Sequence, residues 1–199
     1  MLSGIAGFLL RLGGWKPIGQ LPDVPKAVVI AYPHTSNWDG IWAMIYKVYI
    51  GLDIRFFGKD TLFWFPLNVI LRALGCIPLD RSAPGSAVQQ AVREFAERDS
   101  FYFGLAPEGT RSFRPHWKTG FYRIAREAGV PIVVGYLDHG RREVGLGPSV
   151  HLTGDAEADL DRIRELYAGV HGRWPDKESP IRFPSAEGDA SADSEKSRD

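Results

Sequence analysis

A histidine and an aspartate stand close together in a polar segment, His34 and Asp39 in PHTSNWDG (residues 33–40). If the chain bends from loop into helix between them, the carboxylate can reach one imidazole nitrogen. It would then fix the tautomer and raise the basicity of the other nitrogen, which is free to act as a general base. The alternative is structural, with Asp39 favouring a helix N-terminus and His34 an ordinary loop residue. For an isolated pair at this spacing the structural alternative is favoured.

A second segment, residues 107–112 (PEGTRS), offers groups suited to a phosphate. Gly109 permits backbone conformations closed to other residues. Thr110 and Ser112 carry hydroxyls, and Arg111 carries a guanidinium that can bind a phosphate with two hydrogen bonds. A capping turn with an exposed arginine is the alternative interpretation.

A third segment, residues 75–81 (GCIPLDR), places Arg81 just after a short strand-like stretch, where a surface pair with Asp80 is the simpler interpretation. It also holds Cys76, the only cysteine, so an intrachain disulfide and a cysteine-based zinc site are excluded. Cys76 lies in an apolar run, which is typical of a packed, inert thiol rather than a nucleophile. The sequence has no G-x-S-x-G nucleophile elbow.

Length and charge predict one globular domain with an acidic end. The chain has 199 residues, with 24 basic and 24 acidic side chains. This balance argues against a nucleic-acid partner bound through a broad basic field. The charge is uneven, because residues 175–199 hold seven acids and four bases and are rich in Ser, Ala and Pro. We therefore expect a mildly basic body and a disordered acidic tail.

The elements that must position these side chains alternate between strands and helices. Continuous apolar runs predict strands at residues 27–32, 54–57, 76–79, 101–105 and 132–137, with a hairpin partner at 143–146. Apolar residues at helical spacing predict helices at 38–49, 62–74 (broken or kinked at Pro66), 84–98, 119–128 and 160–170. This alternation favours a single α/β domain with a central, mostly parallel or mixed sheet flanked by helices, whose strand-end loops carry the chemistry.

The N-terminal residues 1–16 predict a short apolar helix, either packed on the domain or lying in a membrane interface. No apolar stretch has the roughly 20 residues needed to span a bilayer. The expected organisation is therefore this helix, a domain over residues 17–174, and the tail over residues 175–199.

Taken in order, the motifs resemble those of the glycerolipid acyltransferases, the lysophosphatidate acyltransferase-like family. That family shows H-x-x-x-x-D, G-x-I-x-x-x-R, E-G-T-R and V-P-I-V elements, found here as His34/Asp39 and as residues 75–81, 108–111 and 130–133. Two more family stretches, K-x-x-L and F-K-x-G, resemble residues 57–62 (FGKDTL) and 117–120 (WKTG). The resemblance covers about residues 27–150. The chain departs from the family in lacking a proline often found in the fourth element and in its short N-terminal part.

The resemblance implies transfer of a fatty acyl group from acyl-CoA or acyl carrier protein to the free hydroxyl of a phosphate-bearing, lysophosphatidate-like acceptor. It implies no cofactor, no metal and no covalent acyl-enzyme. His34 would be the general base, and Asp39 would orient it. The residues expected to bind the acceptor phosphate are Arg111, Arg81, Gly109, Thr110 and Lys59. The expected substrate-site loop positions are Glu108, Ser112 and Asn37, with Glu108 either anchoring its loop or contacting the acceptor's glycerol hydroxyls.

The lipid substrate also implies peripheral or monotopic attachment at the cytoplasmic face of the membrane. Besides the N-terminal helix, at least one of the consecutive aromatics Phe63, Trp64 and Phe65 is expected to face lipid or a groove. Three alternatives stay open: transfer to another lysolipid, hydrolysis of the acyl thioester, and a non-catalytic lipid-binding module. The presence of both His34 and Asp39 argues against the module, and a phosphate-binding loop would be superfluous for a hydrolase.

Overall fold

The fold is taken from a computed structural model, which describes residues 2–80 and 85–184. The α-helices are α1 (Leu2–Leu12), α2 (Asn37–Ile50), α3 (Leu67–Ala73), α4 (Ser86–Glu97), α5 (Gly120–Ala128) and α6 (Ala156–Leu166). The strands are β1 (Lys16–Gly19), β2 (Lys26–Tyr32), β3 (Ile54–Lys59), β4 (Cys76–Leu79), β5 (Phe101–Leu105), β6 (Ile132–Asp138) and β7 (Glu143–Val150). Two short 3-10 turns, η1 (Asp60–Leu62) and η2 (Pro175–Lys177), complete the described elements.

The seven strands form one mixed sheet in the order β1-β7-β6-β2-β5-β3-β4. Neighbouring strands run parallel except for the β6–β7 hairpin. The central strand β2 pairs with β5 and β6, so that Ile30 lies opposite both Leu105 and Val134. The predicted α/β domain with a mostly parallel, mixed sheet is confirmed.

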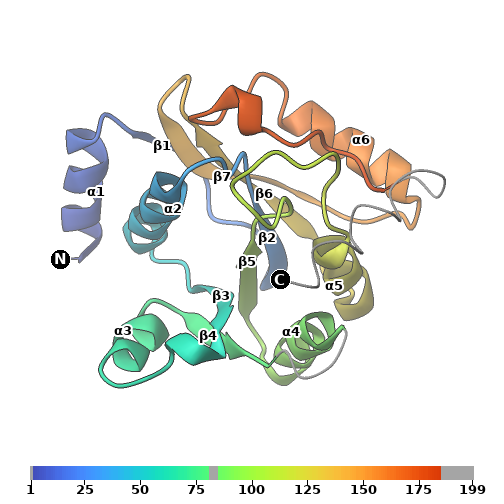
Figure 1. The fold of residues 1–199 in the computed structure, drawn as a ribbon, viewed down its shortest axis with the longest axis horizontal. Helices are drawn as coiled ribbons and strands as arrows, with labels where there is room; N and C mark the ends of the chain where they lie inside the picture. Colours follow the sequence, from blue (N-terminus) through green and yellow to red (C-terminus); the bar gives the residue numbers. More distant parts are fainter. Residues whose placement is uncertain (1, 81–84, 185–199) are drawn as a thin grey trace.

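Helices cover both faces of this sheet (Figure 1). Because successive side chains on a strand point to opposite faces, β2 serves two cores. Val28 and Ile30 pack in the core under α4, α5 and α6, whereas Ala27 and Val29 pack in the core under α1 and α2. This double burial explains why β2 is a continuous apolar run rather than an alternating one.

Three parts of the chain differ from the sequence-based expectations. The strand β1 was not expected, and the helix around residues 62–74 is reduced to η1 and α3, with α3 starting immediately after Pro66. The expected tail is partly built into the domain, because Ser179 is fully buried and Phe183 packs against the core. The rest of that tail, residues 185–199, lies outside the described residues.

The expected N-terminal helix is present as α1, and it packs on α2 (Figure 1). Its inner face is small or buried, with Ala6 and Leu10 almost inaccessible. Its outer face exposes five large apolar side chains, Leu2, Ile5, Phe8, Leu9 and Leu12. Within the described residues, none of the helices combines the length and the apolar character that crossing a bilayer requires.

Candidate active site

The loop between β2 and α2 brings His34 and Asp39 together, and the start of α2 explains how. Ser36 is the N-cap of α2, and its side chain accepts a hydrogen bond from the Trp38 amide at 3.2 Å. In return, Asp39 Oδ2 accepts the Ser36 amide at 2.8 Å, which completes a capping box. The Asp39 side chain is thereby fixed and fully buried, with Oδ2 3.7 Å from His34 Nδ1. The contact that the spacing permits, and that the family resemblance implied, is present beside the helix-capping role of Asp39.

The second carboxylate oxygen of Asp39 has a partner that sequence reasoning missed. His139, which follows β6, places its Nε2 2.7 Å from Asp39 Oδ1. The two residues are 100 positions apart, and no motif surrounds His139, so the sequence around it does not predict the contact. Asp39 therefore lies between two histidines and contacts His139 more closely than His34.

The environment of His34 favours a neutral imidazole. Burial is the main cause that lowers the pKa of His34 below its usual 6.5, and the positive charge of Arg111 lowers it further. The Asp39 carboxylate acts in the opposite direction but does not cancel these effects. Because Nδ1 faces Asp39, Nε2 is the nitrogen left to act as a general base.

Glu108 ties the second motif to the histidine loop. Its Oε1 accepts the backbone amide of His34 at 2.6 Å, and its Oε2 accepts the backbone amide of Ser179 at 3.2 Å. The side chain is almost completely buried, and this burial raises the pKa of Glu108 above its usual 4.5. Of the two roles considered from the sequence, the structure shows the anchoring one, with backbone amides as the partners.

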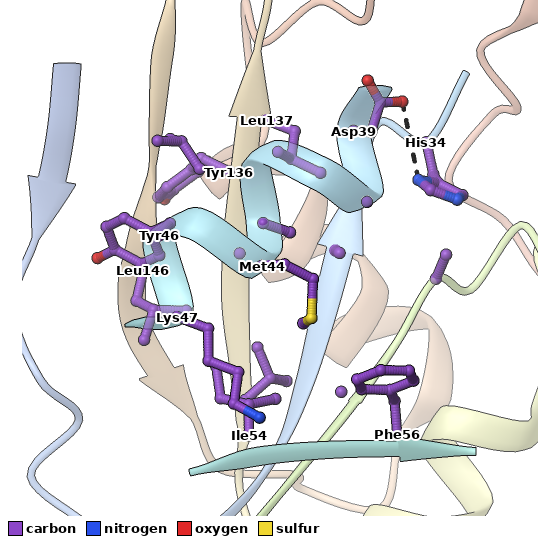
Figure 2. Close-up of a pocket in the computed structure, with 18 of the residues that line it drawn as sticks. His34, Asp39, Met44, Tyr46, Lys47, Ile54, Phe56, Tyr136, Leu137 and Leu146 are labelled. Carbon is purple, nitrogen blue, oxygen red and sulfur yellow. Dashed lines mark ion pairs between the residues drawn. The ribbon is translucent and has the colours of Figure 1, made fainter. Parts of the chain in front are cut away.

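An apolar cavity of about 250 Å³ lies between α2 and the sheet, with His34 and Asp39 at one end (Figure 2). Gly40, Ala43 and Met44 line it from α2, and Leu137 and Leu146 line it from the sheet. Lys47 borders it as well, where its ammonium group donates to the carbonyl of Leu74. Apart from His34 and Asp39 at one end and the Lys47 ammonium group, the walls are suited to a hydrocarbon chain.

A second cavity, of about 540 Å³, lies beside the 107–111 segment and shares His34 with the first. It is lined by Gly109, Thr110, Arg111 and Lys118, together with apolar side chains from β3, β5 and α5. Gly109 has φ +66°, the left-handed conformation that glycine adopts freely, and a Cβ there would lie 2.8 Å from the Lys118 side chain. Two cations and a turn of backbone thus line part of this cavity, and most of its remaining lining is apolar.

The other predicted site residues are more scattered. Asn37 is exposed as the first residue of α2, Ser112 is exposed with its amide 3.4 Å from Thr110 Oγ1, and Lys59 is exposed at the end of β3. None of the three lines either cavity. Arg81 lies outside the described residues. Lys118 was part of a recognised motif but was not expected in the site, and it joins Arg111 there.

Comparison with known proteins decides the family. Residues 19–136 match the family model described as acyltransferase. The chain belongs to the acyltransferase family. The resemblance inferred from the motifs is thereby confirmed.

A solved structure shows the same fold as this acyltransferase. It is the crystal structure of the 1-acyl-sn-glycerophosphate (LPA) acyltransferase PlsC from Thermotoga maritima, with a TM-score of 0.57 and 19% sequence identity. The match covers 83% of this chain and 74% of that chain. No curated protein matches the sequence.

The site therefore combines one histidine with the two cavities that it borders. Across the part of the chain that the structure describes, no cluster of His, Cys, Asp and Glu side chains is arranged to hold a metal ion. The described residues offer a half-buried imidazole, an apolar cavity, and a second cavity lined in part by Arg111 and Lys118, and both cavities meet at that imidazole. Such an arrangement suits proton transfer between two bound substrates.

Proposed function

We propose that this acyltransferase moves a fatty acyl group from a thioester, acyl-CoA or acyl carrier protein, to the free hydroxyl of a lysophosphatidate-like acceptor. The observation that carries the proposal is the position of His34, which borders both the apolar cavity and the cationic cavity. The acyl chain lies in the cavity under α2, and the acceptor lies in the cavity beside residues 107–111. The two reacting groups then meet at one base.

In the proposed reaction, His34 Nε2 takes the proton of the acceptor hydroxyl, and the oxygen attacks the thioester carbonyl carbon. Asp39 stabilises the imidazolium that forms. The tetrahedral intermediate collapses as the carbon–sulfur bond breaks, and the imidazolium proton passes to the leaving thiolate. The products are an ester and a free thiol, and no protein side chain is acylated.

The amides of the histidine loop are poor candidates for stabilising the oxyanion. The amide of His34 donates to Glu108, that of Ser36 to Asp39, and that of Asp39 to the Ser36 carbonyl. These donors are already engaged in building the site. Donors from elsewhere around the two cavities are therefore needed for the developing negative charge.

The acceptor phosphate is assigned to Arg111 and Lys118, with the backbone at Gly109 and the Thr110 hydroxyl as further donors. The support is their shared cavity, together with the finding that none of the described residues lining it is acidic. Arg81 stays a candidate on the strength of its motif alone. A guanidinium and an ammonium together compensate most of the charge of a phosphate monoester.

We also propose that the protein attaches to the membrane through the apolar face of α1, which packs on α2, and through the region around α3, which packs beside β4 (Figure 1). Around α3, Trp64 is 59% and Phe65 is 79% exposed, as expected for aromatics that enter an interface. Sedimentation with lipid vesicles tests this attachment. Phe8→Asp and Phe65→Asp should each weaken binding, whereas Phe113→Asp, at another exposed phenylalanine, should leave it unchanged.

The reaction is tested by measuring thiol release from an acyl-CoA with and without lysophosphatidate. We expect release that depends on the acceptor and is lost in His34→Ala. Release without an acceptor would favour the hydrolase, and lipid binding without any release would favour the module. A panel of lysolipids in the same assay identifies the acceptor head group.

A further inference from the structure

A third cavity, of about 510 Å³, adjoins the dyad through His139 rather than through His34. It is lined by Trp38, Trp42, His139, Arg142 and Arg173. The His139 ring forms part of its wall, and Nε2 of the same ring is 2.7 Å from Asp39 Oδ1. A single side chain therefore separates the contents of this cavity from the buried carboxylate. Neither the family match nor the proposed reaction gives the cavity a role.

Two arginines line the cavity, and none of the described residues that line it is a carboxylate. Arg142 directs Nη1 to the carbonyl of Gly13 at 3.4 Å, and the guanidinium of Arg173 lies 5.6 Å from the ring centroid of Trp174. Within residues 2–80 and 85–184, neither guanidinium forms an ion pair with a carboxylate. Two arginines facing one space without a counter-charge are a favourable arrangement for an anion.

The backbone at Arg142 is held in an unusual conformation. Its φ of 57° makes it the one non-glycine residue with positive φ in the described part of the chain. The Arg142 carbonyl accepts the Lys16 amide at 2.7 Å, so the first residue of β1 fixes this turn. A conformation that is costly for a non-glycine residue is thus maintained where it presents an arginine to the cavity.

The aromatic wall adds a flat, partly exposed surface. Trp38 and Trp42 lie one turn apart on α2 and stack with ring centroids 6.5 Å apart and an interplanar angle of 28°. Trp38 is 48% exposed. The cavity also adjoins α1, because Gly13, which Arg142 contacts, directly follows that helix and packs against Trp42. Tryptophan and arginine side chains together suit a phosphate ester, either at a lipid surface or on a nucleotide.

We propose that this cavity is a second phosphate site, distinct from the one at Arg111, and that Arg142 and Arg173 hold a phosphate ester there. The ester belongs either to the headgroup of a membrane lipid beside α1 or to the nucleotide end of a CoA thioester. The site goes beyond the proposed reaction, since none of its lining residues lines either of the two cavities at His34. Its occupancy reaches the dyad through the contact between His139 and Asp39.

The test measures binding of inorganic phosphate to the full chain by isothermal titration calorimetry, in an Arg111→Ala background that weakens the acceptor site. The Arg142→Ala/Arg173→Ala variant should bind phosphate at least tenfold more weakly, about 1.4 kcal/mol. The matched control is Arg93→Ala/Arg123→Ala, which removes two exposed arginines from α4 and α5 and should bind like the background protein. The proposal would be overturned if the two variants had the same affinity for phosphate, or if the Arg111→Ala background protein did not bind phosphate at all.

Two further probes identify the source of the phosphate. If the Arg142→Ala/Arg173→Ala variant loses binding to vesicles that contain phosphatidylglycerol but not to phosphatidylcholine vesicles, the site is assigned to a lipid headgroup. Tighter binding of adenosine 3′,5′-bisphosphate than of phosphate, weakened by Trp38→Ala, would assign it to the nucleotide. His34→Ala should abolish transfer yet keep this binding, so a failure of the proposed reaction and a failure of this site are separable.

Discussion

Replacing Glu108 with glutamine tests whether this carboxylate is an anchor or an acceptor-binding group. Both of its oxygens accept backbone amides, from His34 at 2.6 Å and from Ser179 at 3.2 Å, and its side chain is almost completely buried. Glutamine keeps one carbonyl oxygen and turns an NH₂ group toward the other amide. One buried N–H then loses its acceptor, and the new donor also lacks one.

A buried polar group left without a partner costs about 1–3 kcal/mol. Because the pKa of Glu108 is raised, we expect the cost of the substitution to lie below the upper end of this range. Burial makes ionisation of Glu108 unfavourable in the folded state. The contribution of Glu108 to the free energy of unfolding therefore falls as the pH rises above the usual 4.5. Glutamine is neutral and does not bear this cost. We therefore expect a loss of about 2 kcal/mol at neutral pH. For a chain of this size, that lowers the Tm by about 4–8 °C.

The assay combines thermal unfolding with steady-state kinetics, and Glu127→Gln is the matched control. Glu127 lies on α5, where it is exposed and forms an ion pair with Arg123 at 3.6 Å, so its loss should change stability by less than about 0.5 kcal/mol. In Glu108→Gln the kcat should fall as well, because the backbone of the base loses its anchor. The reasoning is refuted if the two variants unfold at the same temperature. A higher acceptor KM without any change in Tm would indicate contact with the acceptor instead.

Four further changes probe the base, its partners and the apolar cavity. Because burial lowers the pKa of His34, the acid limb of the kcat/KM profile should lie below pH 6.5, and Asp39→Asn should move it lower while reducing the rate. Arg111→Ala should raise the acceptor KM and move the same limb to higher pH, since its charge lowers the pKa of His34; a change in donor KM alone would contradict the assignment. His139→Leu should reduce kcat about tenfold with KM unchanged, and His139→Gln, which keeps a donor, should restore most of it; a change in Tm without one in kcat would limit His139 to stability. Ala43→Leu, which extends into the apolar cavity, should shift the preference among acyl-CoAs toward shorter chains, and an unchanged preference would place the acyl chain elsewhere.

The central part of the fold follows from local sequence, and its edge does not. The apolar run of β2 predicts a strand that is buried on both faces, because each face of the strand packs against a layer of helices. By contrast, β1 is four residues long and contains Pro17, and its strand conformation depends on pairing with β7. A segment this short carries no pattern of its own. The register that forms it comes from residues more than 100 positions away.

The site divides in the same way. The motif that joins His34 and Asp39 could be recognised in the sequence because both residues belong to one local segment, the loop and first turn of α2 with its capping box. The contacts of Ser179 with Glu108 and of His139 with Asp39 join distant segments, so no pattern of spacing can reveal them. Ser179 illustrates the consequence: in sequence it belongs to a polar, proline-rich end, yet its amide completes the hydrogen bonding of a buried carboxylate.

The two cavities at His34 also bear on the order of events in the proposed reaction. A covalent acyl-enzyme needs a nucleophile beside the thioester, and Cys76 is unsuitable because burial raises the pKa of its thiol and it lines neither cavity. His34 itself is held as a base by a buried carboxylate on one side. With the acyl chain under α2 and the acceptor beside Arg111, as proposed, the acceptor hydroxyl and the thioester carbonyl meet at the base only while both cavities are filled. The geometry therefore favours a ternary complex in which the proton and the acyl group move in one encounter, because neither substrate alone brings a nucleophile and a carbonyl to the same nitrogen.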